Sequence, residues 1–224
     1  MRILVGCEES GAVRRAFRAL GHEAFSCDTE RSADDSPHHI QGDVLKVLDD
    51  GWDLGIFFPP CTYLCSSGMH WTTRGLRDPK LTEDALDFVL ALFAAPIPCI
   101  ALENPRGAIG SRIRSATQSI QPYQFGDDAS KETFLWLKNL PQLQPTKFVP
   151  PRLVCGDCKA VFAYGLHKCP ACHSQNYKPR WSNQTDSGQN KLGPSATRAR
   201  DRARTYPGIA QAMARQWSVI LPSK

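Results

Sequence analysis

Two pairs of cysteines carry the strongest chemical signal in the sequence. Each pair has the spacing Cys-x-x-Cys, and ten residues separate the pairs. The four residues are Cys155, Cys158, Cys169 and Cys172. Each pair can place two thiolates on one metal ion, and Gly156 and Pro170 favour the turns that this requires. The spacing predicts a tetrahedral zinc site, with iron or a redox disulfide as the alternatives.

Residues 155–172 contain few large apolar residues, so a bound metal ion should supply much of their folding energy. His167 and His173 lie close by in the sequence. Because four thiolates already complete a tetrahedral site, we expect both histidines to be bystanders.

A further cysteine, Cys61, follows an apolar run at residues 53–58 and two prolines. Prolines cannot donate ladder hydrogen bonds, so the predicted strand must end there and present Cys61 at the carboxyl edge of a sheet. The strand predicted at residues 99–105 contains Glu103 and Asn104 near its end. The carboxyl group of Glu103 should therefore reach the same edge of the sheet. A thiolate beside a carboxylic acid suits addition to an electron-poor heterocycle that the acid activates by protonation.

The first predicted strand, residues 2–6, is followed by a turn that runs from Gly6 to Gly11, here called the glycine-flanked turn, and then by a helical pattern. Such a turn lets a ligand approach the backbone and the helix N-terminus, although many turns of this kind only connect a strand to a helix. Acids at the ends of the next two strands could accept hydrogen bonds from ribose hydroxyls. We therefore predict a site for a nucleoside-containing cofactor. Its residues are Gly6, Glu8, Gly11, Asp28, Asp43 and Pro59.

Short apolar runs alternate with helical patterns over the first 105 residues, which predicts an α/β fold with a parallel sheet. We expect helices at residues 12–20, 82–93 and 130–140, the last capped by Ser130. The final segment carries apolar residues at helical spacing and should return to the first domain. These residues are Ile209, Met213, Trp217 and Ile220.

This pattern predicts a discontinuous catalytic domain formed by residues 1–150 and 198–224. Residues 151–180 would form a zinc ribbon, and residues 181–197 a polar surface loop because they could build almost no core. Cys7, Cys27 and Cys99 are interpreted as small buried apolar residues, and Cys65 as a spectator.

The composition excludes a membrane protein, because the 224 residues contain no apolar run near the roughly 18 that a membrane span requires. The N-terminus lacks the features of a signal peptide, so we expect a cytoplasmic protein. In that reducing compartment a disulfide framework of nine cysteines is not expected.

Charge is distributed unevenly along the chain. Residues 1–145 contain 14 Lys and Arg against 19 Asp and Glu, whereas residues 146–224 contain 13 against 3. The basic C-terminal part favours contact with a phosphate backbone, with a solvated basic surface as the alternative.

In these motifs the chain resembles the DNA cytosine-5 methyltransferases, in particular small phage-type members. The matching pieces occur in the family order. They are VGCEESG as the cofactor turn, Asp28 and Asp43 as the acids, FPPC as the nucleophile motif, ENP in place of the more usual ENV, and TYPGIAQAMA as the C-terminal helix. The resemblance covers about residues 1–110 and 205–218, and FPPC with ENP at this spacing is its most specific part.

The resemblance implies a Rossmann-like S-adenosylmethionine-dependent methyltransferase fold, a duplex DNA partner with a flipped cytosine, and the host cell cytoplasm as the location of a phage protein. Cys61 would attack carbon 6 of the cytosine, and Glu103 would protonate or hydrogen-bond ring nitrogen 3. Carbon 5 would then accept the methyl group before a base removes its proton. Methylation of an exocyclic amine would instead require Asp, Asn or Ser before the two prolines, where this chain has Phe58.

The chain departs from the family in two respects. The proton-relaying motif Gln-x-Arg-x-Arg is not found, and Arg112 and Arg114 are the candidates for that role because they have the Arg-x-Arg spacing. A solvated helix face is the alternative interpretation of these arginines. The family's large target-recognition domain is also missing, so either specificity is low or a smaller device provides it.

Two segments are candidates for nucleic-acid contact. Residues 62–80 follow Cys61 and combine glycines with basic and aromatic side chains, as a loop that closes over DNA would, although an ordinary surface loop is the alternative. The segment after the zinc ribbon offers side chains that read base edges or bind phosphates, unless the ribbon merely braces the fold. The candidate residues are Trp71, Arg74, Arg77, Lys178, Arg180, Gln184, Arg198 and Arg200.

The sequence therefore favours a DNA cytosine-5 methyltransferase. The same chemistry on RNA is one alternative. A zinc-ribbon DNA-binding protein without catalytic activity, built on a decayed methylase fold, is the other, and a hydrolase using Cys61 with His70 leaves the cofactor turn unexplained.

Overall fold

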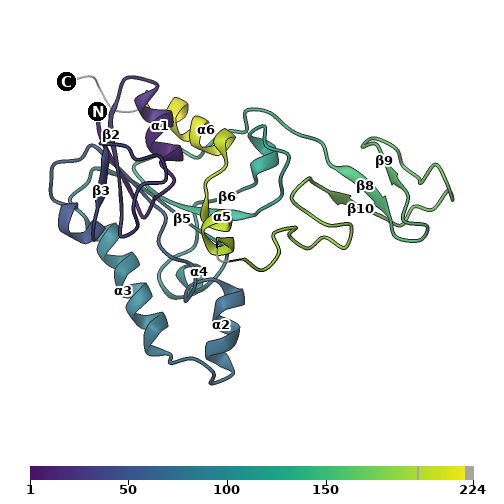
Figure 1. The fold of residues 1–224 in the computed structure, drawn as a ribbon, viewed down its shortest axis with the longest axis horizontal. Coiled ribbons are helices and arrows are strands. Elements are labelled where there is room, and N and C mark those ends of the chain that lie inside the picture. Colours follow the sequence, from purple (N-terminus) through teal and green to yellow (C-terminus); the bar gives the residue numbers. More distant parts are fainter. Residues whose placement is uncertain (196, 220–224) are drawn as a thin grey trace. The chain divides into compact units, whose positions relative to one another are not determined.

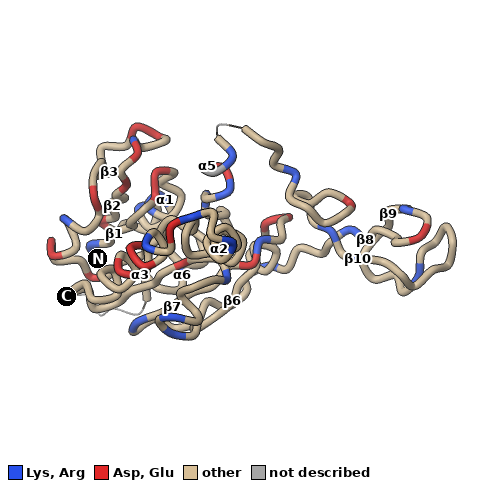
Figure 2. The backbone as a smooth tube through the Cα atoms, turned by 90° about the horizontal axis from the view of Figure 1, so that it is seen from below, with Lys and Arg blue, Asp and Glu red and all other residues tan. Residues whose placement is uncertain are grey.

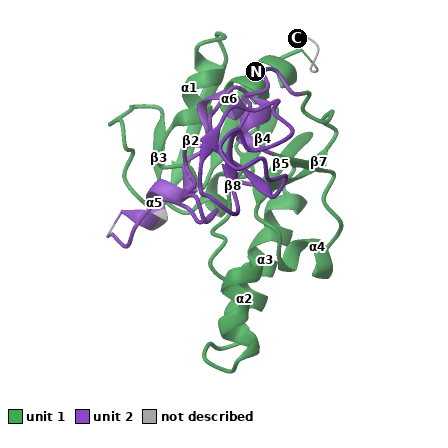
Figure 3. Cartoon of the chain, turned by 90° about the vertical axis from the view of Figure 1, so that its right-hand side faces the viewer, with its two compact units in different colours: residues 1–120, 132–144, 210–224 green, residues 121–131, 145–209 purple. Residues whose placement is uncertain are grey.

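The computed structural model describes residues 1–195 and 197–219, and these form two compact units. Unit 1 comprises residues 1–120, 132–144 and the segment from residue 210 onward. Unit 2 comprises residues 121–131 and 145–209 (Figure 3). The chain therefore leaves unit 1 twice and returns to it twice.

A seven-stranded, mostly parallel sheet forms the centre of unit 1 (Figure 1). Its order is β3-β2-β1-β4-β5-β7-β6, in which the first five strands are parallel and β7 runs antiparallel to both of its neighbours. The strands are β1 (Arg2–Gly6), β2 (Glu23–Asp28), β3 (His39–Gln41), β4 (Leu54–Phe57), β5 (Cys99–Asn104), β6 (Gln118–Ile120) and β7 (Thr133–Lys138). The predicted α/β class is confirmed, and the order is compatible with a Rossmann-like fold, in which ligands bind at the carboxyl ends of the strands.

Helices cover both faces of this sheet. Leu86, Val89 and Leu92 of α3 (Lys80–Ala94) pack with sheet residues that include Leu4 and Leu102. Alternate residues of each strand point to the opposite face, where α1 (Ala12–Arg18) and α6 (Pro207–Trp217) lie (Figure 1). Burial on both faces explains why the strands read as continuous apolar runs rather than as alternating patterns.

The C-terminal helix confirms the predicted return of the chain to the sheet. Met213 and Trp217 are buried, and the indole Nε1 of Trp217 donates to the carbonyl of Pro141 at 3.1 Å. Ile220, which was predicted to belong to the same face, lies outside the described residues.

The helix predicted at residues 130–140 is wrong. This segment forms β7, which pairs with β5 on one side and with β6 on the other, and Ser130 caps no helix there. The alternation of buried and half-buried side chains at Thr133, Phe134 and Leu135 is that of a strand. Hydrogen bonding to two neighbours outweighs the helical preference of the local sequence.

Three further helical segments complete unit 1. Helix α2 (Ser66–Thr73) lies in the segment that was expected to be a loop, and α4 (Ala108–Arg112) follows β5. A 3-10 turn, η1 (Val44–Val47), begins after Asp43. Helix α3 starts at Lys80, two residues before the predicted start at Thr82.

Unit 2 contains a three-stranded antiparallel sheet in the order β10-β8-β9. Its elements are η2 (Pro122–Gln124), β8 (Arg152–Cys155), β9 (Val161–Phe162), β10 (Tyr177–Arg180) and α5 (Arg198–Ala203). Strand β10 lies at the end of the predicted zinc ribbon, residues 151–180. Among the described residues, no helix is long and apolar enough to cross a membrane.

The limits of the two units differ from the predicted domain boundaries. Residues 121–131 and 198–209 belong to unit 2, where they are hydrogen-bonded to each other. The amide of Gly208 donates to Asp127 at 2.9 Å, and the ammonium group of Lys131 donates to the carbonyl of Arg202 at 2.7 Å. The sequence carries no clear signal for these pairings, which connect positions 70 or more residues apart.

Candidate functional site

A hydrogen bond joins the FPPC and ENP motifs. Because β4 and β5 are neighbours in register, Asn104 lies beside Pro59, and its Nδ2 donates to the carbonyl of Pro59 at 2.7 Å. Asn104 is buried, so this bond replaces a ladder bond that the prolines interrupt. The ends of the two strands are thereby fixed relative to each other, as the predicted site at this edge requires.

Cys61 lies in a tight turn directly after β4, and its side chain is exposed rather than packed in the interior. The carbonyl of Cys61 accepts from the amides of Leu64 at 3.1 Å and Cys65 at 2.9 Å. This turn is tied to the segment after β5, because the amide of Ala108 donates to the carbonyl of Leu64 at 2.7 Å. A Cβ on Gly107 would lie 1.8 Å from that same carbonyl oxygen, so only glycine permits this approach.

Glu103 lies in β5, one residue before Asn104, and is half-buried. Its carboxylate accepts a hydrogen bond from the hydroxyl of Thr133, which is buried in β7. Thr133 was missed by the sequence analysis because its segment was interpreted as a helix. The run of aromatic and β-branched residues at 133–136 was the signal that could have revealed a strand there.

The glycine-flanked turn after β1 is built around Glu8. The carboxylate of Glu8 is buried and accepts from the amides of Val13 at 2.7 Å and Arg14 at 3.4 Å, so it caps the N-terminus of α1. Burial raises the pKa of Glu8 to about 7, although these amides and the charges of Arg14 and Arg15 favour the ionised form. The Glu8 side chain, which was predicted to bind the cofactor, is therefore already hydrogen-bonded to α1.

The two glycines of the turn have structural reasons for being glycine. Gly11 has φ 65°, the left-handed region, at the N-cap of α1. A Cβ on Gly6 would lie 2.6 Å from the ring of Phe57. Both residues thus bring β1, β4 and α1 close together at the carboxyl edge of the sheet.

Asp28 and Asp43 lie at this edge, as predicted. Asp28 ends β2 and its carbonyl accepts from the amide of Gly42 at 2.8 Å, while Asp43 caps η1 through the amide of Leu45 at 3.0 Å. Burial, reinforced by the nearby carboxylates of Asp28 and Asp43, raises the pKa of the Cys7 thiol far above its usual range. Acidic acceptors therefore gather around the glycine-flanked turn, where a hydroxyl-bearing ligand could donate to them.

Burial also raises the pKa of the Cys27 thiol to about 11, and raises that of Cys99. Both residues are buried. The interpretation of Cys27 and Cys99 as buried packing residues is confirmed, whereas Cys7, for which the same was predicted, is half-buried and Cys61 is exposed.

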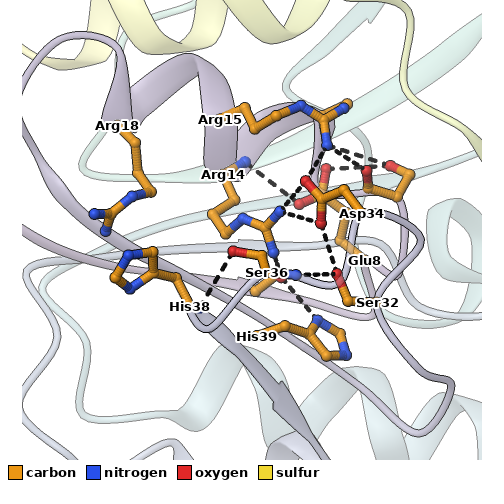
Figure 4. A network of polar contacts seen from close by, with 12 residues as sticks. Glu8, Arg14, Arg15, Arg18, Ser32, Asp34, Ser36, His38 and His39 are labelled. Carbon is orange, nitrogen blue, oxygen red and sulfur yellow. Dashed lines mark hydrogen bonds and ion pairs between the residues drawn. The ribbon is translucent and has the colours of Figure 1, made fainter.

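A buried arginine fixes the loop that follows Asp28 (Figure 4). Arg14 of α1 is 1% exposed, and its guanidinium donates to Ser26 at 2.9 Å and to Asp34 at 2.6 Å. The Ser26 hydroxyl also contacts Nδ1 of His39 at 2.8 Å. Residues 29–38 are thereby held against the glycine-flanked turn, in an arrangement that the sequence analysis did not foresee.

Arg112 and Arg114, the candidate proton-relaying arginines, have partners elsewhere in unit 1. Arg112 forms an exposed ion pair with Glu83 of α3 at 2.9 Å. The guanidinium of Arg114 lies over the ring of Phe93, 4.4 Å from its centroid. These contacts brace α3 and the segment after α4.

The segment after Cys61 forms helix α2 and an exposed turn. Trp71 and Arg74 are exposed, and no side chain of α2 is buried. Arg77 donates to the carbonyl of Thr62 at 3.1 Å and lies over the ring of Tyr63. Arg77 thus ties the far end of the segment to the residue that follows Cys61.

The four cysteines of unit 2 form one cluster. Their Sγ atoms all lie within 4.8 Å of one another, with separations of 3.6 Å for Cys155 and Cys172 and 3.5 Å for Cys158 and Cys169. Tetrahedral zinc with Zn–S bonds of about 2.3 Å requires sulfur atoms roughly 3.8 Å apart. The cluster could therefore hold zinc, and within the part of the chain that the structure describes it includes neither His167 nor His173.

The two Cys-x-x-Cys turns have the same backbone form. Lys159 and His173, each directly after the second cysteine of its pair, have φ of 65° and 59°. Asp157 connects the turns, since its carboxylate accepts from the amide group of Asn176 at 2.9 Å and from the hydroxyl of Ser174. The sulfur atoms are therefore held by local hydrogen bonds as well as by any bound ion.

The predicted nucleic-acid residues of unit 2 are distributed over two elements. Lys178 is exposed on β10, and Arg198 and Arg200 belong to α5. Arg180 donates to the carbonyl of Asp186 at 2.9 Å, and the Gln184 side chain accepts from the amide of Trp181 at 3.2 Å. Figure 2 shows Lys and Arg along unit 2 with few acids between them.

Comparison with known proteins adds no relative. No family model matches the chain, and neither does any curated protein.

Proposed function

We propose that the protein transfers a methyl group to carbon 5 of cytosine in DNA. The observation that carries the proposal is the Asn104–Pro59 hydrogen bond, which fixes the strand ends that bear the exposed Cys61 and the carboxylate of Glu103. A thiolate and an acid on adjacent strand ends suit nucleophilic addition to a pyrimidine ring. Phe58 before the prolines cannot accept a hydrogen bond from an exocyclic amine, which favours methylation of carbon.

In the proposed reaction, the Cys61 sulfur forms a bond to carbon 6 while Glu103 donates a proton or hydrogen bond to nitrogen 3. S-adenosylmethionine, held near the glycine-flanked turn with Asp28 and Asp43, would supply the methyl group. Loss of the carbon 5 proton to a base then lets the bond between Cys61 and carbon 6 break, which restores the aromatic ring and the thiolate. The cytosine must leave the stack, because its carbon 6 is not accessible inside a duplex.

The test is methyl transfer from tritiated S-adenosylmethionine to DNA. Cys61→Ala should abolish product, whereas Cys65→Ala, which removes a thiol four residues away, should retain it. DNA containing 5-fluorocytosine should form a covalent adduct with the wild-type protein, because fluorine cannot leave carbon 5 as a cation. Activity of the Cys61 variant equal to that of the wild type would reject this nucleophile. Competition between DNA and RNA substrates decides between the two polymers.

One observation favours a DNA-binding protein without catalytic activity. Arg112 and Arg114 contact Glu83 and Phe93, so neither is assigned to the relay of the proton. DNA binding with no methyl transfer at saturating S-adenosylmethionine would support this second function.

A further inference from the structure

Four aromatic rings in unit 2 form a continuous series, here called the aromatic row. Trp181 stacks on Tyr123 with centroids 4.3 Å apart and planes inclined by 12°. Tyr123 contacts Phe148 edge-on at 5.9 Å, and Phe148 contacts Tyr164 at 6.0 Å. The row therefore connects η2 to the loop after β9.

The inner end of the row is anchored by hydrogen bonds. Nε1 of Trp181 donates to the carbonyl of Val149 at 3.1 Å, and the amide of Val149 donates to the carbonyl of Tyr123 at 2.8 Å. These bonds hold the segment that carries Phe148. A ligand that binds the row would consequently meet side chains that are already ordered, which lowers the entropic cost of binding.

The outer end of the row is exposed to solvent. Phe148 is 53% exposed and Tyr164 is 58% exposed, and these two rings contact each other. The buried core around the cysteines is formed instead by Leu153, Phe162 and their neighbours. Exposed apolar side chains gathered in this way mark a binding surface more often than a structural requirement.

The charge of unit 2 indicates what this surface binds. Residues 121–131 and 145–209 contain 12 Lys and Arg against 5 Asp and Glu. A zinc ion held by four thiolates would lower the net charge of this unit by only two. Lys147, which is exposed, directly precedes Phe148. A net positive charge together with flat exposed rings is the combination that binds single-stranded nucleic acid, through phosphate contacts and base stacking.

We propose that Phe148 and Tyr164 stack against unpaired bases of DNA. The identification of the polymer as DNA rests on the proposed function. A methylase that flips a base leaves the opposite base unpaired and the adjacent bases unstacked. It provides a small contact surface in a chain without a large target-recognition domain. Stacking alone would favour distorted or single-stranded sites over any particular base sequence.

The test compares two fluorescein-labelled DNAs in fluorescence anisotropy, without S-adenosylmethionine. One is a fully paired duplex, and the other is the same duplex with a four-nucleotide single-stranded gap. The double variant Phe148→Leu and Tyr164→Leu keeps apolar side chains but removes the rings. It should bind the gapped DNA at least about 30-fold more weakly than the wild type, because each of the two stacked bases contributes about 1–3 kcal/mol. Its affinity for the paired duplex should change little. Leu166→Ala, an exposed apolar residue of the same loop, should bind both DNAs like the wild type.

Zinc content and the thermal midpoint, measured for each variant, exclude an effect through unfolding. Equal weakening of both DNAs would overturn the proposal, because it would indicate contact with the backbone only. Unchanged binding with loss of self-association in sedimentation would also overturn it and assign the row to a second copy of the chain. Stacking without any methyl transfer would reject the proposed function and leave this inference in place.

Discussion

Glu103 and Cys61 each depend on a neighbour that makes no bond to a substrate. Thr133 donates a hydrogen bond to the Glu103 carboxylate from β7, and Asn104 donates one to the carbonyl of Pro59, two residues before Cys61. Both donors are buried, so water cannot easily replace them. At the scale of single residues, these two hydrogen bonds therefore fix the geometry of the candidate site.

Replacement of Thr133 by valine should lower the rate of methyl transfer about 10-fold, because a hydrogen bond to a charged group contributes about 1.5–3 kcal/mol. The loss should appear in kcat, while the KM for DNA stays unchanged, because Thr133 positions Glu103 and does not contact DNA. Steady-state kinetics with tritiated S-adenosylmethionine measures both.

Thr133→Ser retains the hydroxyl and should keep most of the activity. Thr117→Val serves as the stability control, because it removes a hydroxyl that accepts a hydrogen bond from the amide of Leu137 in β7. Wild-type kinetics in Thr133→Val would show that this hydrogen bond does not position the acid.

Among the elements, the loop at residues 29–38 is held in place by a partly buried ion pair. Arg14 is 1% exposed and contacts both Ser26 and Asp34. Burial alone would raise the pKa of Asp34, but hydrogen bonds from Arg14, Ser32 and Arg15 hold this pKa well below its usual range. The pair therefore stabilises the fold where the unfolded chain is ionised, above about pH 4.

Asp34→Asn should lower the free energy of unfolding at pH 7 by about 3 kcal/mol, because it removes the carboxylate that contacts the buried guanidinium of Arg14. The difference from the wild type should shrink as the pH falls below about 4, since the folded wild type must then hold a carboxylate that the unfolded chain has protonated. Urea titrations at several pH values provide the measurement.

Asp35→Asn is the matched control, since Asp35 pairs with Arg31 at an exposed position one residue away. It should leave the unfolding midpoint nearly unchanged. A difference for Asp34→Asn that is independent of pH would show that the ion pair is not its source.

At the scale of the whole molecule, the two units have different sources of stability. Unit 1 buries a large apolar core around its sheet, whereas the buried residues around the cysteine cluster, within the described part of the chain, are Leu153, Cys155, Phe162 and Cys169. Such a small core needs a metal ion or another cross-link.

Removal of zinc by a strong chelator should unfold the β8–β9–β10 sheet and leave the sheet of unit 1 folded. Hydrogen exchange measured by mass spectrometry should show lost protection at residues 152–180 and retained protection at β1, β4 and β5. The folded protein should contain one zinc ion per chain by elemental analysis, and Cys158→Ser should contain much less. Cys99→Ser, a buried cysteine of unit 1, should keep the full content. Unchanged protection after chelation would show that the metal does not stabilise unit 2.

Several features could be predicted from the sequence because their signals are local. The continuous apolar runs of β1, β4 and β5, the amphipathic pattern of α6 and the spacing of the four cysteines each depend on neighbouring residues along the chain. The prolines at 59 and 60 end a strand wherever it lies, so the position of Cys61 at a strand end also followed.

Other features were decided by tertiary structure, because they depend on residues that are distant in the sequence. Residues 133–138 became a strand when they paired with β5 and β6, and this pairing brought Thr133 to Glu103. The partners of Arg14 and Arg112 lie 20 and 29 residues away, so their roles could not be read from spacing. The sequence by itself determined which chemical groups are present and which local elements carry them. The tertiary structure decided which of these groups meet, since hydrogen bonds and packing between distant segments select one arrangement among many that the local patterns permit.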